Sequence, residues 1–191
     1  KSKNIFAARD LRGVKPLYYY IKNEKIIFCS EIAPILKLID NEEIDEIGLR
    51  QYLKLRLFSN GHTIYKSIKI VKPGYYYDNG KFFQYFSNIN TIEKHDDSKF
   101  LMPCIKRSIT KREMADVKIG SLLSGGLDSS ILTALSKVKN TWSIGFDNNN
   151  EFYWAEKVAK FLKKKHQSIE YNSDKFLEHL KFMVLNLKKP L

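Results

Sequence analysis

One stretch organises this sequence: Gly120-Ser121-Leu122-Leu123-Ser124-Gly125-Gly126-Leu127-Asp128-Ser129-Ser130-Ile131-Leu132. The mainly apolar run from Val117 to Leu123 predicts a short buried strand. The pair Gly125-Gly126 then predicts a tight turn, because residues without a Cβ adopt left-handed backbone conformations at little cost.

A helix start is predicted directly after the turn. Asp128, Ser129 and Ser130 have the side chains typical of helix N-termini, and Ile131, Leu132 and Leu135 supply an apolar face. A strand, a glycine-rich loop and a helix N-terminus in this order direct backbone N–H groups and the positive end of a helix dipole at one point. This geometry suits a phosphate group.

An ordinary loop that enters an ordinary helix also uses Gly-Gly before Asp or Ser. Two features favour a functional loop. Hydroxyls at Ser124, Ser129 and Ser130 flank the glycines, and Asp128 would repel phosphate unless Mg²⁺ or a hydrogen-bond network occupied it. The loop contains no lysine, so it is not the GxxxxGK[ST] loop of phosphoryl-transferring NTPases. Pyrophosphate held as a leaving group fits better.

Residues 124–130, Ser-Gly-Gly-Leu-Asp-Ser-Ser, resemble the SGGLDSS pyrophosphate loop of the glutamine-dependent asparagine synthetases at all seven positions. The looser SGGxDS pattern is shared with other ATP pyrophosphatases, including argininosuccinate, GMP and NAD synthetases. Ala115-Asp116-Val117 and Gly120 upstream favour the asparagine synthetase branch, although Lys118 stands where that family usually has Pro.

The resemblance implies ATP as the nucleotide and Mg²⁺ as its metal ion. The residues that it assigns to nucleotide binding are Leu123, Ser124, Gly125, Gly126, Asp128, Ser129, Ser130 and Ile144. Leu123 and Ile144 would contact the nucleoside and the others the pyrophosphate, with Asp128 reaching Mg²⁺ through the Mg–pyrophosphate complex. For Ile144 alone, plain core packing is the other interpretation.

Residues 1 to about 86 predict antiparallel hairpins, with short helices at Glu31–Ile39 and, after an Asp45 cap, Glu46–Leu57. Asp78-Asn79-Gly80 predicts a hairpin turn. The tyrosines at 18–20 and 75–77 are expected to be strand residues with hydroxyls exposed at the rim.

This half also resembles the asparagine synthetases. Residues 9–19 are similar to their RDxxGxKPLYY element, although Arg12 replaces a usually apolar residue, and residues 28–32 are similar to FxSExK. The similarity implies the second half of a glutaminase domain with the N-terminal-nucleophile hydrolase fold. Its catalytic cysteine would be the first residue of the mature chain. Here position 1 is Lys, and Cys29 and Cys104 do not fall on that place. We therefore assign no catalytic residue, and expect the 191-residue chain alone to be inactive.

The polar segment 88–98 predicts a linker, in which His95 is expected to be a solvated loop residue. Helices are then predicted at 99–114, 151–165 and 174–187, and strands at 141–147 and 166–171. The alternation of strands and helices predicts a parallel sheet, whose ligands bind at the carboxyl ends of the strands.

Composition limits the alternatives. The net charge of +12 is spread evenly along the chain, which argues against a nucleic-acid footprint. The tightest basic run, Lys163–Lys165, is expected to complement the dipole at a helix end. No membrane-spanning run or signal peptide is visible. Two cysteines are too few for a disulfide framework or a metal cluster, which indicates a cytoplasmic protein.

The sequence therefore predicts a chain of mixed α/β and α+β class. A partial glutaminase domain at 1–87 is followed by the linker 88–98 and by a partial Rossmann-like ATP-pyrophosphatase domain with a parallel sheet at 99–191. The resemblance implies an AMP-forming carbon–nitrogen ligase that takes aspartate, glutamine and ATP, and allows a homodimer. The open alternative is an amide ligase of this architecture acting on another carboxylate, such as a β-lactam precursor, a peptide or a sugar acid. Lys188-Lys189-Pro190, where the family commonly has an acid before Pro, leaves the acceptor open.

Overall fold

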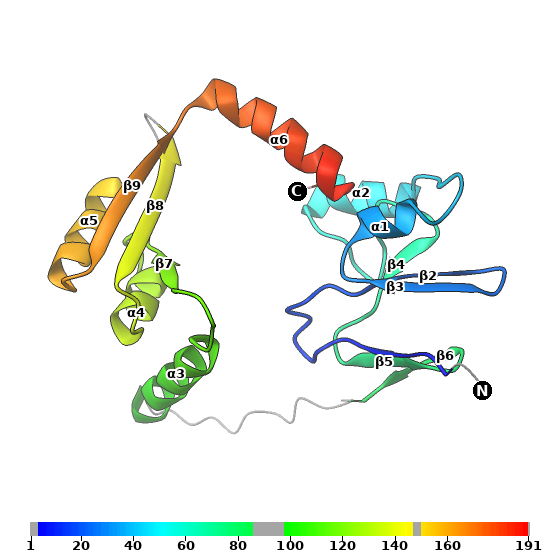
Figure 1. Cartoon of the computed structure of the whole chain (residues 1–191), viewed down its shortest axis with the longest axis horizontal. Helices are drawn as coiled ribbons and strands as arrows, with labels where there is room; N and C mark the ends of the chain where they lie inside the picture. Colours follow the sequence, from blue (N-terminus) through cyan, green and yellow to red (C-terminus); the bar gives the residue numbers. More distant parts are fainter. Residues whose placement is uncertain (1–3, 86–97, 147–149, 191) are drawn as a thin grey trace. The chain divides into compact units, whose positions relative to one another are not determined.

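The computed structural model describes residues 4–85, 98–146 and 150–190. The chain divides into two compact units, Lys1–Thr91 with Leu180–Leu191, and Ile92–His179 (Figure 1). The expected linker residues 88–97, with His95, lie outside the described residues, and helix α3 begins at Ser98. The mixed α/β class with a parallel sheet is confirmed.

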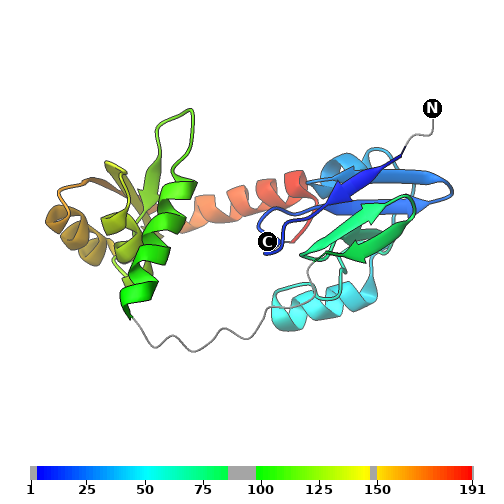
Figure 2. The same cartoon turned by 90° about the horizontal axis from the view of Figure 1, so that it is seen from below.

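The first unit contains two three-stranded antiparallel sheets, of order β1-β5-β6 and β3-β2-β4 (Figures 1 and 2). Its elements are β1 (Phe6–Ala8), β2 (Tyr18–Lys22), β3 (Lys25–Cys29), α1 (Ile32–Leu36), α2 (Glu46–Leu55), β4 (Ile68–Ile70), β5 (Tyr75–Asp78) and β6 (Lys81–Gln84). The predicted hairpins are confirmed. The β5–β6 turn has positive φ at both Asn79 (42°) and Gly80 (97°), the conformation for which the Asn-Gly pair is selected.

The tyrosine runs do form strands β2 and β5, but the prediction that their hydroxyls lie at an exposed rim is wrong for two of them. Tyr18 is 7% exposed and packs in a core with Ile32, Ile35 and Ile68. Tyr77 is 2% exposed. Side chains alternate between the two faces of a strand, so Tyr18 and Tyr20 share one face of β2, and Tyr20 packs against the same core.

A guanidinium organises the loop between β1 and β2. Arg9 donates hydrogen bonds to the carbonyl oxygens of Lys15 (3.0 Å), Gly13 (2.9 Å) and Val71 (2.6 Å). The neighbouring Asp10 carboxylate accepts from three backbone N–H groups, those of Arg12, Val14 and Lys15. The planar fork of arginine and the two oxygens of aspartate thus fold this loop back on itself. The Arg-Asp pair of the sequence element has a structural role.

Both predicted helices of this unit are present and shorter than expected. Helix α1 covers Ile32–Leu36. Helix α2 ends at Leu55, because Arg56 takes a left-handed conformation at φ 57°. Its predicted cap is confirmed: Asp45 accepts hydrogen bonds from the N–H groups of Ile47 (3.0 Å) and Gly48 (3.1 Å).

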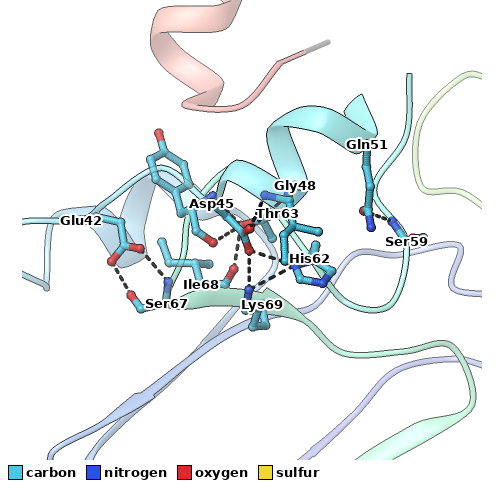
Figure 3. Close-up of polar contacts among 12 residues, drawn as sticks. Glu42, Asp45, Gly48, Gln51, Ser59, His62, Thr63, Ser67, Ile68 and Lys69 are labelled. Atoms are coloured by element: carbon cyan, nitrogen blue, oxygen red, sulfur yellow. Dashed lines mark hydrogen bonds and ion pairs between the residues drawn. The ribbon is translucent and has the colours of Figure 1, made fainter. Parts of the chain in front are cut away.

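The Asp45 carboxylate also joins α2 to the strand region. It accepts from Lys69 Nζ at 2.7 Å and lies 2.9 Å from His62 Nδ1 (Figure 3). The helix lies so close that a Cβ on Gly48 would stand 2.0 Å from the carbonyl oxygen of Thr63. Burial by itself raises the pKa of Asp45, but the hydrogen bonds from Lys69, His62 and the Gly48 N–H outweigh it and hold that pKa well below its ordinary value.

The second unit contains α3 (Ser98–Arg112), β7 (Gly120–Leu122), α4 (Leu127–Leu135), β8 (Asn140–Phe146), α5 (Phe152–Phe161) and β9 (Lys165–Tyr171). Helix α6 (Ser173–Leu187) follows. Strands β7, β8 and β9 pair in this order and are parallel, as the strand–helix alternation predicts. Helix α5 packs on β8 and β9, with Leu123, Ala155 and Ala159 buried in the core beneath it.

Two local predictions are wrong. The strand before the loop is shorter and less buried than its apolar run indicates: it begins at Gly120, and Val117 and Leu122 are 77% and 69% exposed. Leu122 lies on the sheet face opposite α5, as does Ile144, which is 62% exposed. The described residues thus cover one face of this sheet, and the apolar side chains on its other face are exposed.

Helix α5 ends at Phe161, four residues before the predicted end, because Lys163 has a φ of 53°. Lys163–Lys165 therefore lies after the end of α5 and leads into β9. Lys164 Nζ instead donates to the carbonyl oxygens of Ser136 (3.1 Å) and Val138 (2.6 Å) and holds the loop before β8. Among the helices of the described ranges, none is long and apolar enough to cross a membrane.

We predict that Asp45→Ala lowers the unfolding free energy at pH 7 by about 1–3 kcal/mol, because α2 loses its cap and Lys69 loses its buried acceptor. Since the pKa of Asp45 is lowered in the folded state, its contribution is present above the unfolded pKa near 3.8 and is lost as the pH falls below that value. Urea denaturation at pH 7 and at pH 3 measures this.

The matched control is Glu46→Ala, which removes the exposed carboxylate next along the chain, 3.7 Å from Arg50. Equal losses for the two variants, or an Asp45→Ala loss that is unchanged at pH 3, would contradict the assigned role of Asp45.

Candidate functional site

The loop Ser124–Gly126 connects the carboxyl end of β7 to the start of α4. Leu123 continues the pairing of the sheet, since its N–H donates to the carbonyl oxygen of Trp142 at 2.8 Å. The loop therefore leaves the sheet at the edge where parallel α/β sheets bind ligands. The predicted order of strand, loop and helix N-terminus is confirmed.

Gly125 has a φ of +83°, the left-handed region that favours glycine. It also lies against the first turn of α5. A Cβ at this position would stand 2.6 Å from the backbone carbon and Cβ of Trp154 and 2.7 Å from the nitrogen of Ala155. Conformation and space both exclude a side chain here, so this glycine sets how closely the loop and α5 approach.

Ser124 and Ser129 hold the loop closed. Their Oγ atoms lie 3.0 Å apart, and Ser129 Oγ donates to the carbonyl oxygen of Gly126 at 3.1 Å. The Gly126 N–H in turn donates to Ser124 Oγ at 3.3 Å. The sequence predicts both hydroxyls as phosphate donors. In this structure they bond to the loop itself and preorganise it.

Helix α4 begins at Leu127, directly after the turn as predicted, with Asp128 in its first turn. Its N-cap is Gly126, at φ −71° and ψ 166°, with no side-chain cap bond. Helix geometry leaves the N–H groups of the first turn without intrahelical acceptors. Glycine as the cap supplies no side-chain acceptor for these donors, and Asp128 is exposed in the same turn.

Ser130 differs from the other loop serines. Its Oγ is buried and has no hydrogen-bond partner among the described residues. Ser130 lies in α4, is not among the residues that line the cavity beside the loop, and has its hydroxyl turned away from solvent. An unsatisfied buried hydroxyl costs free energy, which a rotation toward a bound acceptor would recover.

A cavity of about 250 Å³ adjoins the loop. It is lined by Leu122, Leu123, Ser124, Ser129, Trp142, Ser143, Ile144 and Glu151. The predicted residues Leu123 and Ile144 thus meet Ser124 and Ser129 at one hollow. Their exposures differ, since the Leu123 side chain is 1% exposed and belongs to the core, whereas Ile144 is 62% exposed. Ile144 offers the apolar surface.

Sequence reasoning missed four residues of this cavity: Leu122, Trp142, Ser143 and Glu151. Trp142 and Ser143 precede the predicted Ile144 on the same strand. Glu151 is the N-cap of α5, the helix that follows β8. The rule that ligands bind at carboxyl ends of parallel strands could have found it, because the first residues of the next helix return to that edge.

A larger hollow of about 600 Å³ lies at the amino ends of β7 and β8. It is lined by residues 110, 113–115, 117–119 and 137–140, and by none of the loop residues. Its size is within the range of small-molecule sites, but it is separate from the predicted site.

No group of three His, Cys, Asp or Glu side chains able to hold a metal ion occurs within residues 4–85, 98–146 and 150–190. Asp128, in the first turn of α4, is the carboxylate that the sequence predicts for a metal ion at the loop. Mg²⁺ characteristically uses one or two carboxylates together with phosphate oxygens and water, so one carboxylate beside a phosphate-binding loop fits it.

Comparison with known proteins matches both halves of the chain. Residues 103–191 match the family model described as asparagine synthase, and residues 1–86 match the glutamine amidotransferase domain. An asparagine synthetase [glutamine-hydrolyzing] of Bacillus subtilis is 28% identical over 201 residues, which are 98% of this chain and 32% of that protein. The Rattus norvegicus synthetase is 26% identical over 98% of this chain and 36% of its own length. A probable synthetase of Acanthamoeba polyphaga mimivirus is 30% identical over 91% and 33%.

The chain thus combines a glutamine amidotransferase segment with an α/β segment that carries a glycine–serine loop. It belongs to the family of glutamine-hydrolysing asparagine synthetases. It spans about a third of the length of the curated relatives that it matches.

We predict that Gly125→Ala weakens the binding of ATP at least 10-fold and lowers the melting temperature, because a methyl group forces α5 away from the loop. Gly80→Ala is the matched control: its φ is also positive, at +97°, but its added Cβ would meet nothing within 4 Å. It therefore isolates the cost of backbone strain, about 1 kcal/mol. Isothermal titration calorimetry and thermal unfolding distinguish the two, and equal effects would contradict a special role for Gly125.

Proposed function

We propose that the full-length protein is a glutamine-hydrolysing asparagine synthetase, and that this chain supplies its pyrophosphate loop. In the proposed reaction the side-chain carboxylate of aspartate is adenylated by ATP with release of pyrophosphate. Ammonia from glutamine then displaces AMP to give asparagine. The observation that carries the proposal is the loop Ser124–Ser130, which enters a helix N-terminus without a side-chain cap bond and whose Ser124 and Ser129 line a cavity with Leu122 and Ile144.

The loop would act through preorganised donors. The free N–H groups at the start of α4 and the positive end of its dipole would hold the pyrophosphate as it leaves. Because Ser124 and Ser129 already fix the loop, little reorganisation would be needed when negative charge grows, which is how electrostatic preorganisation lowers a barrier. Ile144, with Leu123 beneath, would contact the nucleoside.

Mg²⁺, when bound with ATP, would neutralise charge on the phosphates. Asp128 is the residue of this chain that we assign to it. The carboxylate lies in the first turn of α4, where it would otherwise oppose phosphate binding, so a cation between them accounts for an acid at this position.

We further propose that residues 1–87 are the second half of a glutaminase domain with the N-terminal-nucleophile hydrolase fold, and that residues 99–191 begin a Rossmann-like ATP-pyrophosphatase domain. The antiparallel sheets of the first unit and the parallel sheet of the second support this division. We assign neither Cys29 nor Cys104 as the catalytic nucleophile. Cys29 packs against a hydrophobic core.

The remaining proposals concern the setting of the protein. We propose a cytoplasmic enzyme with aspartate, glutamine and ATP as its small-molecule substrates, and without a nucleic-acid or membrane partner. The even spread of the basic residues along the chain supports the proposal that the protein has no nucleic-acid partner. A homodimer of the full-length protein is the assembly that we propose.

We predict aspartate-dependent release of pyrophosphate from ATP and Mg²⁺ by the full-length protein with ammonia as the nitrogen source, and at least a 100-fold loss of the rate in Asp128→Ala. An enzyme-coupled pyrophosphate assay measures both. Release that requires another carboxylate, such as a peptide or a sugar acid, would retain the loop and replace aspartate as the acceptor. An unchanged rate in Asp128→Ala would contradict the assignment of the loop.

A further inference from the structure

Two helix N-termini meet at the loop. Helix α4 begins directly after Gly126, and the first turn of α5 lies against Gly125 through Trp154 and Ala155. The N-cap of α5 is Glu151, which lines the same cavity as Ser124 and Ser129. An acidic residue at the start of α5 therefore lines the hollow beside the loop at which the phosphates of a nucleotide are proposed to bind.

Glu151 does not act as a helix cap. Its side chain forms no cap hydrogen bond, and the Phe152 N–H donates to Asn150 Oδ1 at 3.3 Å instead. Within the described residues, no hydrogen bond or ion pair of the Glu151 carboxylate occurs. Glutamate is not among the residues favoured at this position, which are Ser, Thr, Asp and Asn. Ser, Thr, Asp or Asn would therefore cap α5 better than Glu151 does, and the described part of the chain shows no other role of the Glu151 side chain in folding.

The arrangement of the cavity indicates which part of a nucleotide Glu151 would meet. Phosphates belong at the loop, where the donors converge, and the base belongs on the apolar surface of Leu122 and Ile144. The sugar must lie between them. A carboxylate repels phosphate but accepts strongly from neutral hydroxyls, and charge-assisted hydrogen bonds of this kind are shorter and stronger than neutral ones. Acidic side chains near the carboxyl ends of parallel strands bind ribose hydroxyls in other doubly wound folds.

We propose that Glu151 is a specificity residue that accepts hydrogen bonds from the ribose hydroxyls of the nucleotide. This inference rests on the proposed function, since it needs a nucleotide at the loop. It makes the site selective for ribonucleotides, and it separates the task of Glu151 from that of Asp128: Asp128 serves the metal–phosphate end and Glu151 the sugar.

The test measures binding to the full-length protein by isothermal titration calorimetry. Mg²⁺ complexes of ATP, 2′,3′-dideoxyATP and tripolyphosphate serve as probes. Wild type should bind ATP about 10-fold more tightly than dideoxyATP, the difference expected for a hydrogen bond to a charged group. Glu151→Ala should abolish this ratio and Glu151→Gln, which keeps a neutral acceptor, should reduce it, and both should leave tripolyphosphate binding unchanged or tighter.

Glu170→Gln is the matched control, because it removes the same charge from an exposed residue of β9 that does not line the cavity. It should keep the wild-type ratio. A wild-type ratio that survives in Glu151→Ala overturns the inference, while ATP binding in that variant upholds the nucleotide site. Equal losses for ATP, dideoxyATP and tripolyphosphate also overturn it, since they place Glu151 at the metal–phosphate end. Absence of ATP and tripolyphosphate binding in wild type overturns the proposed function together with the inference.

Discussion

The close approach of α5 to Gly125 is the constraint on which the second unit depends. No Cβ fits between the loop and the backbone of Trp154 and Ala155, so the chain must leave β7 through a glycine in a left-handed conformation. This contact brings the N-terminus of α5 to the loop, buries Leu123 against Ala155 and Ala159, and places Glu151 at the cavity. The packing of α5 and the candidate chemistry of the loop therefore both require a glycine at position 125, and a substitution there would disturb both.

The first unit has an equivalent constraint in Asp45. One carboxylate caps α2, accepts from Lys69 and lies beside His62, while Gly48 lets the helix pass within contact of Thr63. The group is buried and paired, which makes it a structural element rather than an open site. Polar groups thus have different roles in the two units. In the first, Asp45 joins a helix to a strand, and in the second, the cap of α4 supplies no side-chain acceptor for the first N–H groups of the helix.

Much of the fold could be predicted from short-range patterns. The Asp45 cap, the Asn79-Gly80 turn and the parallel β7–β8–β9 sheet follow from local chemistry and from the alternation of elements. The ends of the helices could not be predicted, because single residues such as Arg56 and Lys163 adopt left-handed conformations that these residue types do not indicate. Burial could not be predicted where it depends on neighbours: Val117 is apolar yet exposed, and Tyr77 is polar-tipped yet buried. At the site, the loop was visible as a motif, whereas Glu151 joins it only through the packing of α5.

The central claim is that the loop at Ser124–Ser130 holds the pyrophosphate part of a nucleotide. Hydrogen–deuterium exchange with and without Mg²⁺ and inorganic pyrophosphate tests it most directly, because the claim concerns the backbone N–H groups themselves. The account predicts slower exchange at the loop and in the first turn of α4, with the hollow near Lys118 and Lys139 unaffected. Unchanged exchange at the loop, or protection confined to that other hollow, would contradict it.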